Sequence, residues 1–542
     1  MTLHVDAVIV GAGFAGIAQA LALREAGVES FVIVERAARV GGTWRDNTYP
    51  GIACDVPSHL YGLESHPWPR WSRVFAPGRE IQAYLERIVA EEGLEQHLML
   101  GTALTSARWH DGAWRVSLQP GSPYPGPSHP GSFQHNAVDP SARPPGNPSL
   151  AAPGAESTAL CWGGEGEVVA DHLVLAAGRL TEPRIPEITG LGTFSGPLFH
   201  SSRWDHTTAP HHDLAGRRIA VVGTGATAIQ LVPELARRGA QVTLFQRTPA
   251  WIVPRGDHPV DAADMRRFES DPSALAEHRA RLHAEGEARF ASRSGDAVAA
   301  AEMRQVALDH LARQVPDAEL RRALTPDYAF GCKRVLLSDD FYPAIASGAI
   351  TLEPSALAEV RGSELVSASG ARHSADMIVL ATGFETSRQP YAALVTGERG
   401  TTLDAHWSRG MTAVASTLVA GFPNLFVLNG PNASLGHNSS VLLSEAQAEL
   451  AAGLIAERAA APFAFPGPIR VTDAAEEAST QEIAERATRT PWLTGGCANW
   501  YVDDRSGRLT LLWPGTVADF RARLARARPV GAPALQNEGV TT

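Results

Sequence analysis

A chain of 542 residues is too long for one hydrophobic core and predicts two or three domains. Its 47 basic and 58 acidic residues give a net charge of −11, which argues against a basic nucleic-acid-binding face and a polybasic membrane anchor. The four cysteines, Cys54, Cys161, Cys332 and Cys497, form no CxxC pair; this argues against a disulfide scaffold, a zinc site and a dithiol reductase and fits a reducing compartment.

The chain enters a strand pattern almost at once, at VDAVIVGAG (residues 5–13). This leaves no room for a signal peptide, and no run of 18 apolar residues predicts a membrane span. We therefore expect a cytoplasmic protein.

A strand–turn–helix pattern covers residues 5–27, and Gly27 is the expected helix stop. The turn carries the GxGxxG motif of dinucleotide-binding folds, formed by Gly11, Gly13 and Gly16. Such glycines allow a tight turn, a close approach of the backbone to a pyrophosphate, and packing of the helix on the strand. The helix N-terminus would then face the phosphates.

A second strand, FVIVE, ends at Glu35, which lies 35 − 11 = 24 positions after Gly11. An acidic residue at this place can accept hydrogen bonds from ribose hydroxyls. The complete strand–helix–strand unit is therefore a strong dinucleotide-binding signal, whereas GxGxxG alone is a weak one.

An irregular loop is expected over residues 41–61, GGTWRDNTYPGIACDVPSHLY, because it lacks helical or strand periodicity. Taken alone, Asp55 within it would be a turn residue. Short strands are expected over residues 101–118. Residues 119–158 are rich in Pro, Gly, Ser and Asn and predict a poorly ordered insertion.

Residues 194–205, FSGPLFHSSRWD, have the pattern Phe-x-Gly-x3-His-x3-Trp-Asp. Its members are Phe194, Gly196, His200, Trp204 and Asp205. Gly196 permits a tight bend, and His200 and Trp204 would share one face of a helical turn. By itself the segment could be a domain linker with a buried aromatic residue and a hydrogen-bonded histidine.

Residues 217–249 repeat the strand–turn–helix–strand plan, with Ala228 at the third glycine position. Arg247 lies 247 − 223 = 24 positions after Gly223, where the first unit has Glu35. An acidic residue would repel a 2′-phosphate, whereas a guanidinium can bind it bidentately. The first unit therefore suits FAD and the second suits NADPH rather than NADH. The predicted NADP contacts in this unit are Gly223, Thr224, Gly225, Ala226, Arg247 and Thr248.

Interleaved charged and apolar residues predict a solvated helical subdomain over residues 258–328. Lys333 and Arg334 follow; by default they would be surface charges or partners of Asp339 and Asp340. Three near-continuous apolar runs indicate strands buried on both faces. The expected fold class is therefore α/β, with two doubly wound Rossmann-like domains and a site in the cleft at the carboxyl ends of their strands.

The chain resembles the type I Baeyer–Villiger monooxygenases, a class B flavoprotein family. The resemblance is carried by residues 194–205, by GGTW and YPG-x-x-CD within 41–61, by the Lys-Arg pair, and by residues 421–440 and 496–515. Related N- and S-monooxygenases carry Tyr or Phe where this chain has Trp204-Asp205. The resemblance covers nearly the whole chain except residues 119–158.

This resemblance implies a FAD domain from residues 1–180 and 386–542 around an NADPH domain at 181–385. It implies oxidation of a ketone by O2 and NADPH through a C4a-peroxyflavin, giving an ester or lactone. Arg334 would be the catalytic arginine, oriented by Asp55 beside the flavin. The FAD contacts implied in addition to Gly11, Gly13, Gly16 and Glu35 are Gly42, Thr43, Trp44, Tyr61 and Asn429. Lys333 would contact the 2′-phosphate and Trp500 the nicotinamide half of NADP. We expect His200 and Trp204 to act on domain geometry rather than on bond making.

Four alternative functions compete with this interpretation. A flavin N- or S-monooxygenase is disfavoured by Trp204-Asp205 and by Asp55 with Arg334. An NADPH oxidase forming only peroxide, or a non-catalytic FAD- and NADPH-binding protein, would be expected if Asp55 or Arg334 were absent. A disulfide reductase would need a redox cysteine pair. The identity of the ketone and the oligomeric state are not indicated by any of these patterns.

Overall fold

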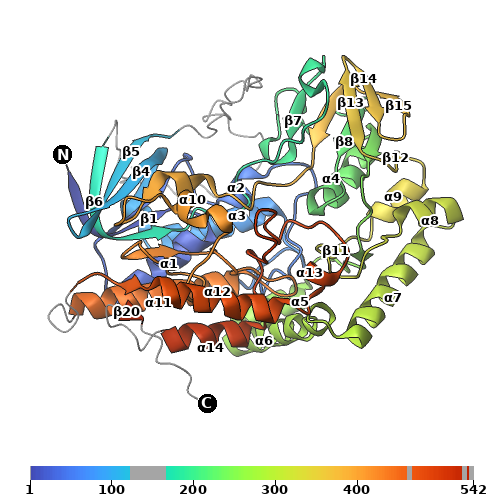
Figure 1. Ribbon diagram of the computed structural model, residues 1–542. Helices are drawn as coiled ribbons and strands as arrows, with labels where there is room; N and C mark the ends of the chain where they lie inside the picture. Colours follow the sequence, from blue (N-terminus) through green and yellow to red (C-terminus); the bar gives the residue numbers. More distant parts are fainter. Residues whose placement is uncertain (1, 122–165, 461–466, 528–533, 536–542) are drawn as a thin grey trace, which may run out of the picture.

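The computed structural model describes residues 2–121, 166–460, 467–527 and 534–535 (Figure 1). From residue 122 onward the insertion predicted at 119–158 lies outside these residues. Two sheets stand apart in the view, one near the N-terminus and one at the upper right.

The first sheet has the strand order β17-β4-β5-β6-β1-β2-β3, and β18 also pairs with β6. The strands are β1 (Leu3–Val10), β2 (Phe31–Glu35), β3 (Leu98–Leu100), β4 (Thr102–His110), β5 (Ala113–Pro120), β6 (Gly166–Leu175), β17 (Val395–Thr396) and β18 (Leu425–Val427). Strands β18, β6, β1, β2 and β3 pair in parallel, and β4 and β5 add an antiparallel arm. The second half of β1 and all of β2 are buried, because one face of these strands packs against helices α1 and α11 and the other against the β4–β5 arm.

Helix α1 (Phe14–Glu25) packs against α11 (Val441–Ala460) on this sheet. Helix α1 ends two residues before Gly27, whose φ of 78° is a conformation that glycine adopts without strain. The predicted helix stop is confirmed.

The second sheet is entirely parallel, with the order β12-β9-β8-β16-β7. Its strands are β7 (Leu198–His200), β8 (Arg218–Val222), β9 (Gln241–Phe245), β12 (Ile350–Glu353) and β16 (Met377–Leu380). Helices α4 (Ala226–Arg237) and α9 (Phe341–Ala346) pack beside it. A separate antiparallel group of β13 (Leu357–Arg361), β14 (Glu364–Ser367) and β15 (Arg372–Ser374), seen near β8 in Figure 1, packs against residues of β8 and β16. The predicted class, α/β with two doubly wound sheets, is confirmed.

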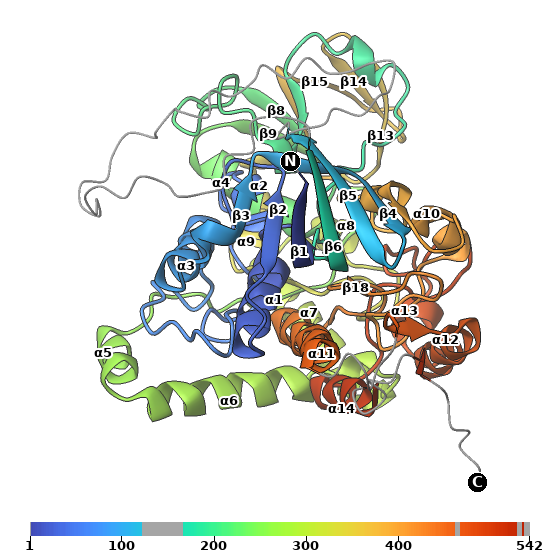
Figure 2. The same cartoon turned by 90° about the vertical axis from the view of Figure 1, so that its left-hand side faces the viewer.

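The segment predicted as helical, 258–328, forms four α-helices and a 3-10 turn. They are α5 (Ala262–Ser270), α6 (Pro272–Ala288), η4 (Ala291–Arg293), α7 (Ala297–Gln314) and α8 (Ala318–Leu324). Each α-helix starts after an aspartate whose carboxylate accepts backbone N–H bonds: Asp261, Asp271, Asp296 and Asp317. Helix α6 runs below α1 and α11 in Figure 2, and its Arg279 donates to the backbone oxygens of His59 and Gly62.

The C-terminal part contributes α12 (Asp473–Ala487), α13 (Pro491–Thr494) and α14 (Val517–Ala527), with α14 against α11. The remaining elements are α2 (Thr43–Asp46), α3 (Gly78–Glu91), η1 (Leu94–His97), η2 (Leu191–Thr193), η3 (Ser201–Arg203), β10 (Ile252–Val253), β11 (Leu336–Leu337), η5 (Pro390–Leu394), α10 (Leu403–His406), η6 (Trp407–Arg409), β19 (Arg470–Val471) and β20 (Ala534–Leu535). Among the described residues, no helix has the length and apolar character needed to cross a membrane.

One disulfide joins Cys332 to Cys497, 165 positions apart. The scattered cysteines argued against a disulfide scaffold, and for this pair that argument was misleading. A pairing over such a separation leaves no local spacing pattern, so it follows only from the tertiary fold. The bond connects the loop before Lys333 to the segment before Trp500.

Candidate functional site

The first glycine loop has the geometry of a phosphate site. Gly11 has a φ of 109°, and a Cβ there would lie 2.5 Å from the oxygen of Ala176. A Cβ at Gly16 would lie 1.9 Å from the oxygen of Gly11. Helix α1 begins after Gly13 without a side-chain cap, in contrast to the aspartate-capped helices of the insertion. Its N-terminal amides can therefore bind an anionic group of FAD.

Several predicted FAD contacts come together around this loop. A Cβ at Gly13 would lie 3.6 Å from the Cα of Gly42, so the two loops meet backbone to backbone. The indole Nε1 of Trp44 donates to the Tyr61 hydroxyl at 3.3 Å. Thr43 starts the short helix α2 at the same place. The irregular segment 41–61 thus wraps the mouth of the first glycine loop.

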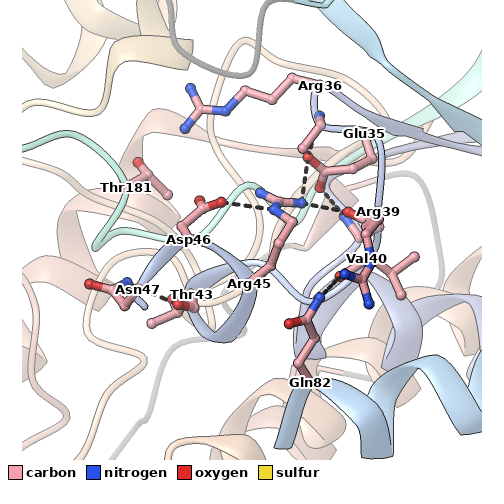
Figure 3. Close-up of polar contacts among 12 residues, drawn as sticks. Glu35, Arg36, Arg39, Val40, Thr43, Arg45, Asp46, Asn47, Gln82 and Thr181 are labelled. Atoms are coloured by element: carbon pink, nitrogen blue, oxygen red, sulfur yellow. Dashed lines mark hydrogen bonds and ion pairs between the residues drawn. The ribbon is translucent and has the colours of Figure 1, made fainter. Parts of the chain in front are cut away.

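Glu35 is buried at the end of β2 and is held by three partners (Figure 3). Its carboxylate accepts from the amides of Ala12 at 3.0 Å and Ala37 at 2.9 Å, and Arg45 Nη1 lies 3.0 Å from Oε1. Arg45 also donates to Asp46 at 2.8 Å. Glu35 therefore fixes the glycine loop itself, and its contact with a ribose stays a prediction. Sequence reasoning missed Arg45, although it is a cation inside the segment that carries Thr43 and Trp44.

The second glycine loop repeats the first. Gly223 has a φ of 113°, and a Cβ there would lie 2.4 Å from the oxygen of Ala381. Gly225 precedes α4, which also lacks a side-chain cap, and a Cβ on Gly225 would meet nothing within 4 Å in the described part of the chain beyond its sequence neighbours. The Thr224 hydroxyl donates to the Thr248 oxygen at 2.8 Å, which ties the loop to the segment that follows β9. Ala226 is the first residue of α4.

Two cations lie close to each other beyond this loop. Arg247 is exposed, and burial and, to a smaller extent, the charge of Arg247 lower the pKa of Lys333. Mutual repulsion of this kind is relieved when an anion binds between the two groups. The neighbouring Gln246 is buried and donates to the Ala323 oxygen at 2.7 Å, so it is not available to a ligand. Arg247 and Lys333 therefore fit a 2′-phosphate.

Asp55 and Arg334 form an ion pair although 279 positions separate them in sequence. Asp55 Oδ2 accepts from Arg334 Nε at 2.8 Å and lies 2.6 Å from Nη2. Their side chains are 25% and 30% exposed, so the pair is held firmly but remains open to a substrate. The charge of Asp55 raises the pKa of Arg334, against the effect of burial. Asp339 instead accepts from the amides of Arg255 and Gly256, which excludes the default pairing with Arg334.

Helix α4 holds the loop that carries Asp55. Gln230 on α4 donates to the Ala53 oxygen at 3.0 Å and accepts from the Tyr49 hydroxyl at 3.1 Å. Arg255 Nη2 donates to the Cys54 oxygen at 2.9 Å. Both contacts link the NADPH-type unit to the FAD-type unit next to the ion pair. Sequence reasoning missed Gln230 because a glutamine on an amphipathic helix carries no distinctive pattern.

The residues of segment 194–205 build local structure in the second sheet. His200 ends β7, which pairs with β16 at Leu380, and it is buried with a pKa lowered to about 4 by burial and by the charge of Arg203. Trp204 is buried and donates to the Ala209 oxygen at 2.9 Å. Asp205 accepts from the amides of Thr207 and Thr208 and so closes the turn.

The expected bend at Gly196 is present, and a Cβ there would lie 2.3 Å from the Asp376 oxygen, so the close approach of that backbone also requires glycine. His200 and Trp204 flank the short 3-10 turn η3, and their rings contact different partners. The His200 ring packs on Phe384, and Trp204 packs on Phe199, while Phe194 lies against the core under β13.

Asn429 and Trp500 lie on two C-terminal segments that meet at a buried arginine. Arg179 donates to the Asn429 side chain, to the Ala433 oxygen at 3.0 Å and to the Leu511 oxygen at 3.1 Å. Burial lowers the pKa of Arg179 to about 10. Trp500 is partly buried, and its ring centroid lies 4.5 Å from that of Tyr501. The structure therefore brings both residues into one region, and their contacts with the cofactors stay predictions.

Comparisons with known proteins agree with this geometry. Residues 9–77 match the family described as NAD(P)-binding Rossmann-like domain, and residues 148–271 match the family described as pyridine nucleotide-disulphide oxidoreductase. A protein of Streptomyces coelicolor named Baeyer-Villiger monooxygenase is 38% identical over 96% of this chain and 91% of its own length. A protein of Pseudomonas aeruginosa with the same name is 34% identical over 96% and 89%. The solved structure titled OTEMO complex with FAD and NADP has a TM-score of 0.77 and 25% identity, covering 97% of this chain and 98% of that chain.

Proposed function

Because the chain belongs to the Baeyer–Villiger monooxygenase family, we propose that the Asp55–Arg334 ion pair is its catalytic centre. The enzyme depends on FAD and NADPH and carries out the reaction ketone + NADPH + H⁺ + O2 → ester or lactone + NADP⁺ + H2O. Bound FAD, reduced by NADPH, supplies the activation of O2. One observation carries this residue assignment: the two predicted catalytic side chains, Asp55 and Arg334, are in direct hydrogen-bond contact.

Arg334 supplies a fixed positive charge at the oxygen of the substrate carbonyl. Negative charge develops on this oxygen during the reaction, and a pre-oriented cation stabilises it without reorganisation. Because the neighbouring carboxylate raises the pKa of Arg334, the guanidinium stays protonated at every working pH and gives no proton away. Asp55 orients the guanidinium because its Oδ2 contacts both Nε and Nη2 of Arg334. Neither of these contacts involves Nη1, which is the group that we assign to the substrate.

The proposed cofactor residues are those that surround the two uncapped helices. For FAD they are Gly11, Gly13, Gly16, Glu35, Gly42, Thr43, Trp44, Asp55, Tyr61 and Asn429; for NADP they are Gly223, Thr224, Gly225, Ala226, Arg247, Thr248, Lys333 and Trp500. The proposed FAD domain consists of residues 1–180 and 386–542, and the NADPH domain of residues 181–385. The return of β17 and β18 to the first sheet supports this division. A cytoplasmic location stays a prediction, because the Cys332–Cys497 disulfide is unusual for a reducing compartment.

The test of this function is turnover of NADPH by the FAD-loaded protein with cyclic, linear and aryl ketones, followed by mass analysis of the products. The expected product is heavier than the ketone by one oxygen atom. Oxygen transferred only to amines or sulfides, or turnover that yields only H2O2, would contradict the proposal and move the protein to a neighbouring enzyme class.

Replacing Arg247 with alanine should raise KM for NADPH and leave KM for NADH nearly unchanged. The 2′-phosphate is the only group that distinguishes the two coenzymes. Loss of one charge-assisted contact costs about 1.5–3 kcal/mol, which corresponds to a rise of about 10- to 100-fold. Steady-state kinetics with both coenzymes measures this ratio. Arg372→Ala, an exposed arginine on β15, is the matched control and should change neither constant. An equal rise for both coenzymes would show that Arg247 does not contact the 2′-phosphate.

Replacing His200 with alanine should slow flavin reduction or raise H2O2 release while FAD stays bound. His200 accepts from the Ser202 amide at 3.2 Å and pairs with Leu380 at the end of β7. The next residue, Ala381, lies directly against Gly223 of the second glycine loop. Loss of the His200 side chain therefore changes the position of the NADPH unit rather than a reacting group. His200→Asn, which keeps an acceptor, should retain more of the reduction rate. Stopped-flow reduction rates equal to those of the wild type would refute the assignment.

A further inference from the structure

A second buried arginine, Arg293, lies between the loops that carry the proposed site. It ends η4 of the helical insertion and is 7% exposed. A Cβ at Gly331 would lie 3.5 Å from Arg293 Cγ, and one at Gly436 would lie 3.7 Å from Arg293 Cδ. Gly331 directly precedes the Cys332-Lys333-Arg334 stretch, and Gly436 belongs to the segment predicted to pass the flavin. Through Arg293, the helical insertion therefore contacts both the loop before Arg334 and the segment predicted to pass the flavin.

Arg293 has no carboxylate partner in the described part of the chain. Its Nη1 donates to the Arg289 oxygen and to the Ser292 hydroxyl, each at 3.0 Å, and no other hydrogen bond of its guanidinium occurs among these residues. Asp55 is bound to Arg334, and Glu287 is bound by Asn438 and the Val517 amide. A buried cation without a counter-charge is costly, so native proteins normally pair it.

Arg293 and Arg334 both lower the pKa of Tyr501, and Arg334 also lowers the pKa of Arg293. Burial lowers the pKa of Arg293 to about 10; nearby Tyr501 opposes this effect, whereas Arg289 and Arg334 add to it. At neutral pH Arg293 therefore remains charged. With one carboxylate, Asp55, and two guanidinium groups, the region has one positive charge that the described residues do not balance.

Tyr501 adds an unused hydrogen-bond donor to this region. The residue is 1% exposed, and its buried hydroxyl has no acceptor for its proton among the described residues. Burial raises its pKa, while the charges of Arg334 and Arg293 and a hydrogen bond with the Arg334 side chain lower it, so the hydroxyl lies beside Arg334 and near Arg293. A buried hydroxyl whose proton has no acceptor also costs free energy. Among the described residues, the Tyr501 hydroxyl and the Nε and Nη2 atoms of Arg293 therefore have no oxygen acceptor.

We propose that Arg293 and Tyr501 bind a carboxylate of the substrate, and that the preferred ketones of this enzyme are keto acids. This inference rests on the proposed function and adds a substrate class to it. A carboxylate accepts two parallel N–H bonds from a guanidinium and can accept a third from a hydroxyl. The ketone carbonyl then lies toward Arg334 and the carboxylate toward Arg293. The bound substrate balances the second positive charge.

Equilibrium binding to the FAD-loaded protein tests the site without turnover. The probes are cyclohexanecarboxylate and the neutral cyclohexanecarboxamide, titrated by calorimetry with and without NADP⁺. The wild type should bind the carboxylate at least about 10-fold more tightly, as expected for a charge-assisted contact. Arg293→Met should remove this preference, Arg293→Lys should keep part of it, and Tyr501→Phe should weaken it several-fold. Arg281→Met, an exposed arginine on α6, is the matched control and should keep it.

Two binding results would overturn the inference. One is equal affinity of the wild type for both probes. The other is a loss of NADP⁺ affinity in Arg293→Met with carboxylate binding unchanged, which would assign the charge to the coenzyme. FAD content and the unfolding temperature show whether each variant is folded, and the lysine variant provides the charge-retaining comparison if the methionine variant is not.

Turnover of a matched ketone pair separates this inference from the proposed function. The pair is 4-oxocyclohexanecarboxylate and its methyl ester. In the wild type, kcat/KM should be at least about 10-fold higher for the acid than for the ester, and in Arg293→Met this difference should disappear. Equal oxidation of both ketones would overturn the keto-acid preference and leave the proposed function intact. Binding of the carboxylate probe without oxidation of either ketone would support the site and count against the proposed function.

Discussion

Arg334→Ala is expected to abolish ester and lactone formation while NADPH still reduces the flavin. Removing a pre-oriented group that stabilises developing negative charge typically costs about 10²–10³-fold in rate. In this protein the loss also leaves Asp55 without its partner, so an uncompensated carboxylate would stand where negative charge develops. We therefore place the effect at the upper end of that range.

The measurement is a comparison of three rates in the same preparation: anaerobic flavin reduction, NADPH oxidation in air, and ester formation. In Arg334→Ala the first should persist, and the NADPH consumed should appear as H2O2 rather than ester. Arg334→Lys keeps the charge but not the two-pronged contact with Asp55, so it should retain a small part of the ester yield. Ester formation at the wild-type rate in the alanine variant would remove Arg334 from the catalytic centre.

The two glycines of the second loop should respond very differently to the same added methyl group. In Gly225→Ala the new Cβ meets no atom of the other described residues within 4 Å, apart from its chain neighbours, so the unfolding temperature should stay nearly unchanged. The methyl group would instead occupy the space that a pyrophosphate needs, and NADPH binding should be lost. FAD binding should persist because the first loop is intact.

Gly223→Ala should instead destabilise the protein. Its φ of 113° is strained for any other residue, and the new Cβ would lie 2.4 Å from the Ala381 oxygen. Backbone strain of this kind costs about 1–3 kcal/mol before the steric overlap is added. Thermal unfolding and titration with NADPH distinguish the two variants. Equal unfolding temperatures for both would mean that the loop is not built as described.

The two dinucleotide units could be predicted from sequence because their signals are local. Strand, glycine turn, helix and second strand follow one another within about 35 residues, and the glycine positions are required by the backbone itself. Gly11 and Gly223 show this requirement directly, since both have positive φ and both approach the backbone of a neighbouring strand end. The helical insertion was equally readable from its periodicity.

The long-range contacts that assemble the site could not be predicted from local sequence patterns. Asp55 and Arg334 were paired through a family resemblance, and nothing in their local sequence predicts an approach across 279 positions. Gln230 and Ala53 are 177 positions apart, and Arg293 reaches the site from a helical segment that looked merely solvated. Such contacts depend on how the two sheets are placed relative to each other. A single sequence contains no periodic signal for that placement.

The Cys332–Cys497 bond also changes the covalent topology of the chain. While it is intact, residues 332–497 form a closed ring that includes Arg334, β16, β18 and α11, with residues 1–331 and 498–542 as two tails. A protease that cuts once inside the ring opens it without releasing a fragment. Such nicked enzyme would migrate as one species under non-reducing conditions and as two after reduction, so electrophoresis alone could conceal the damage.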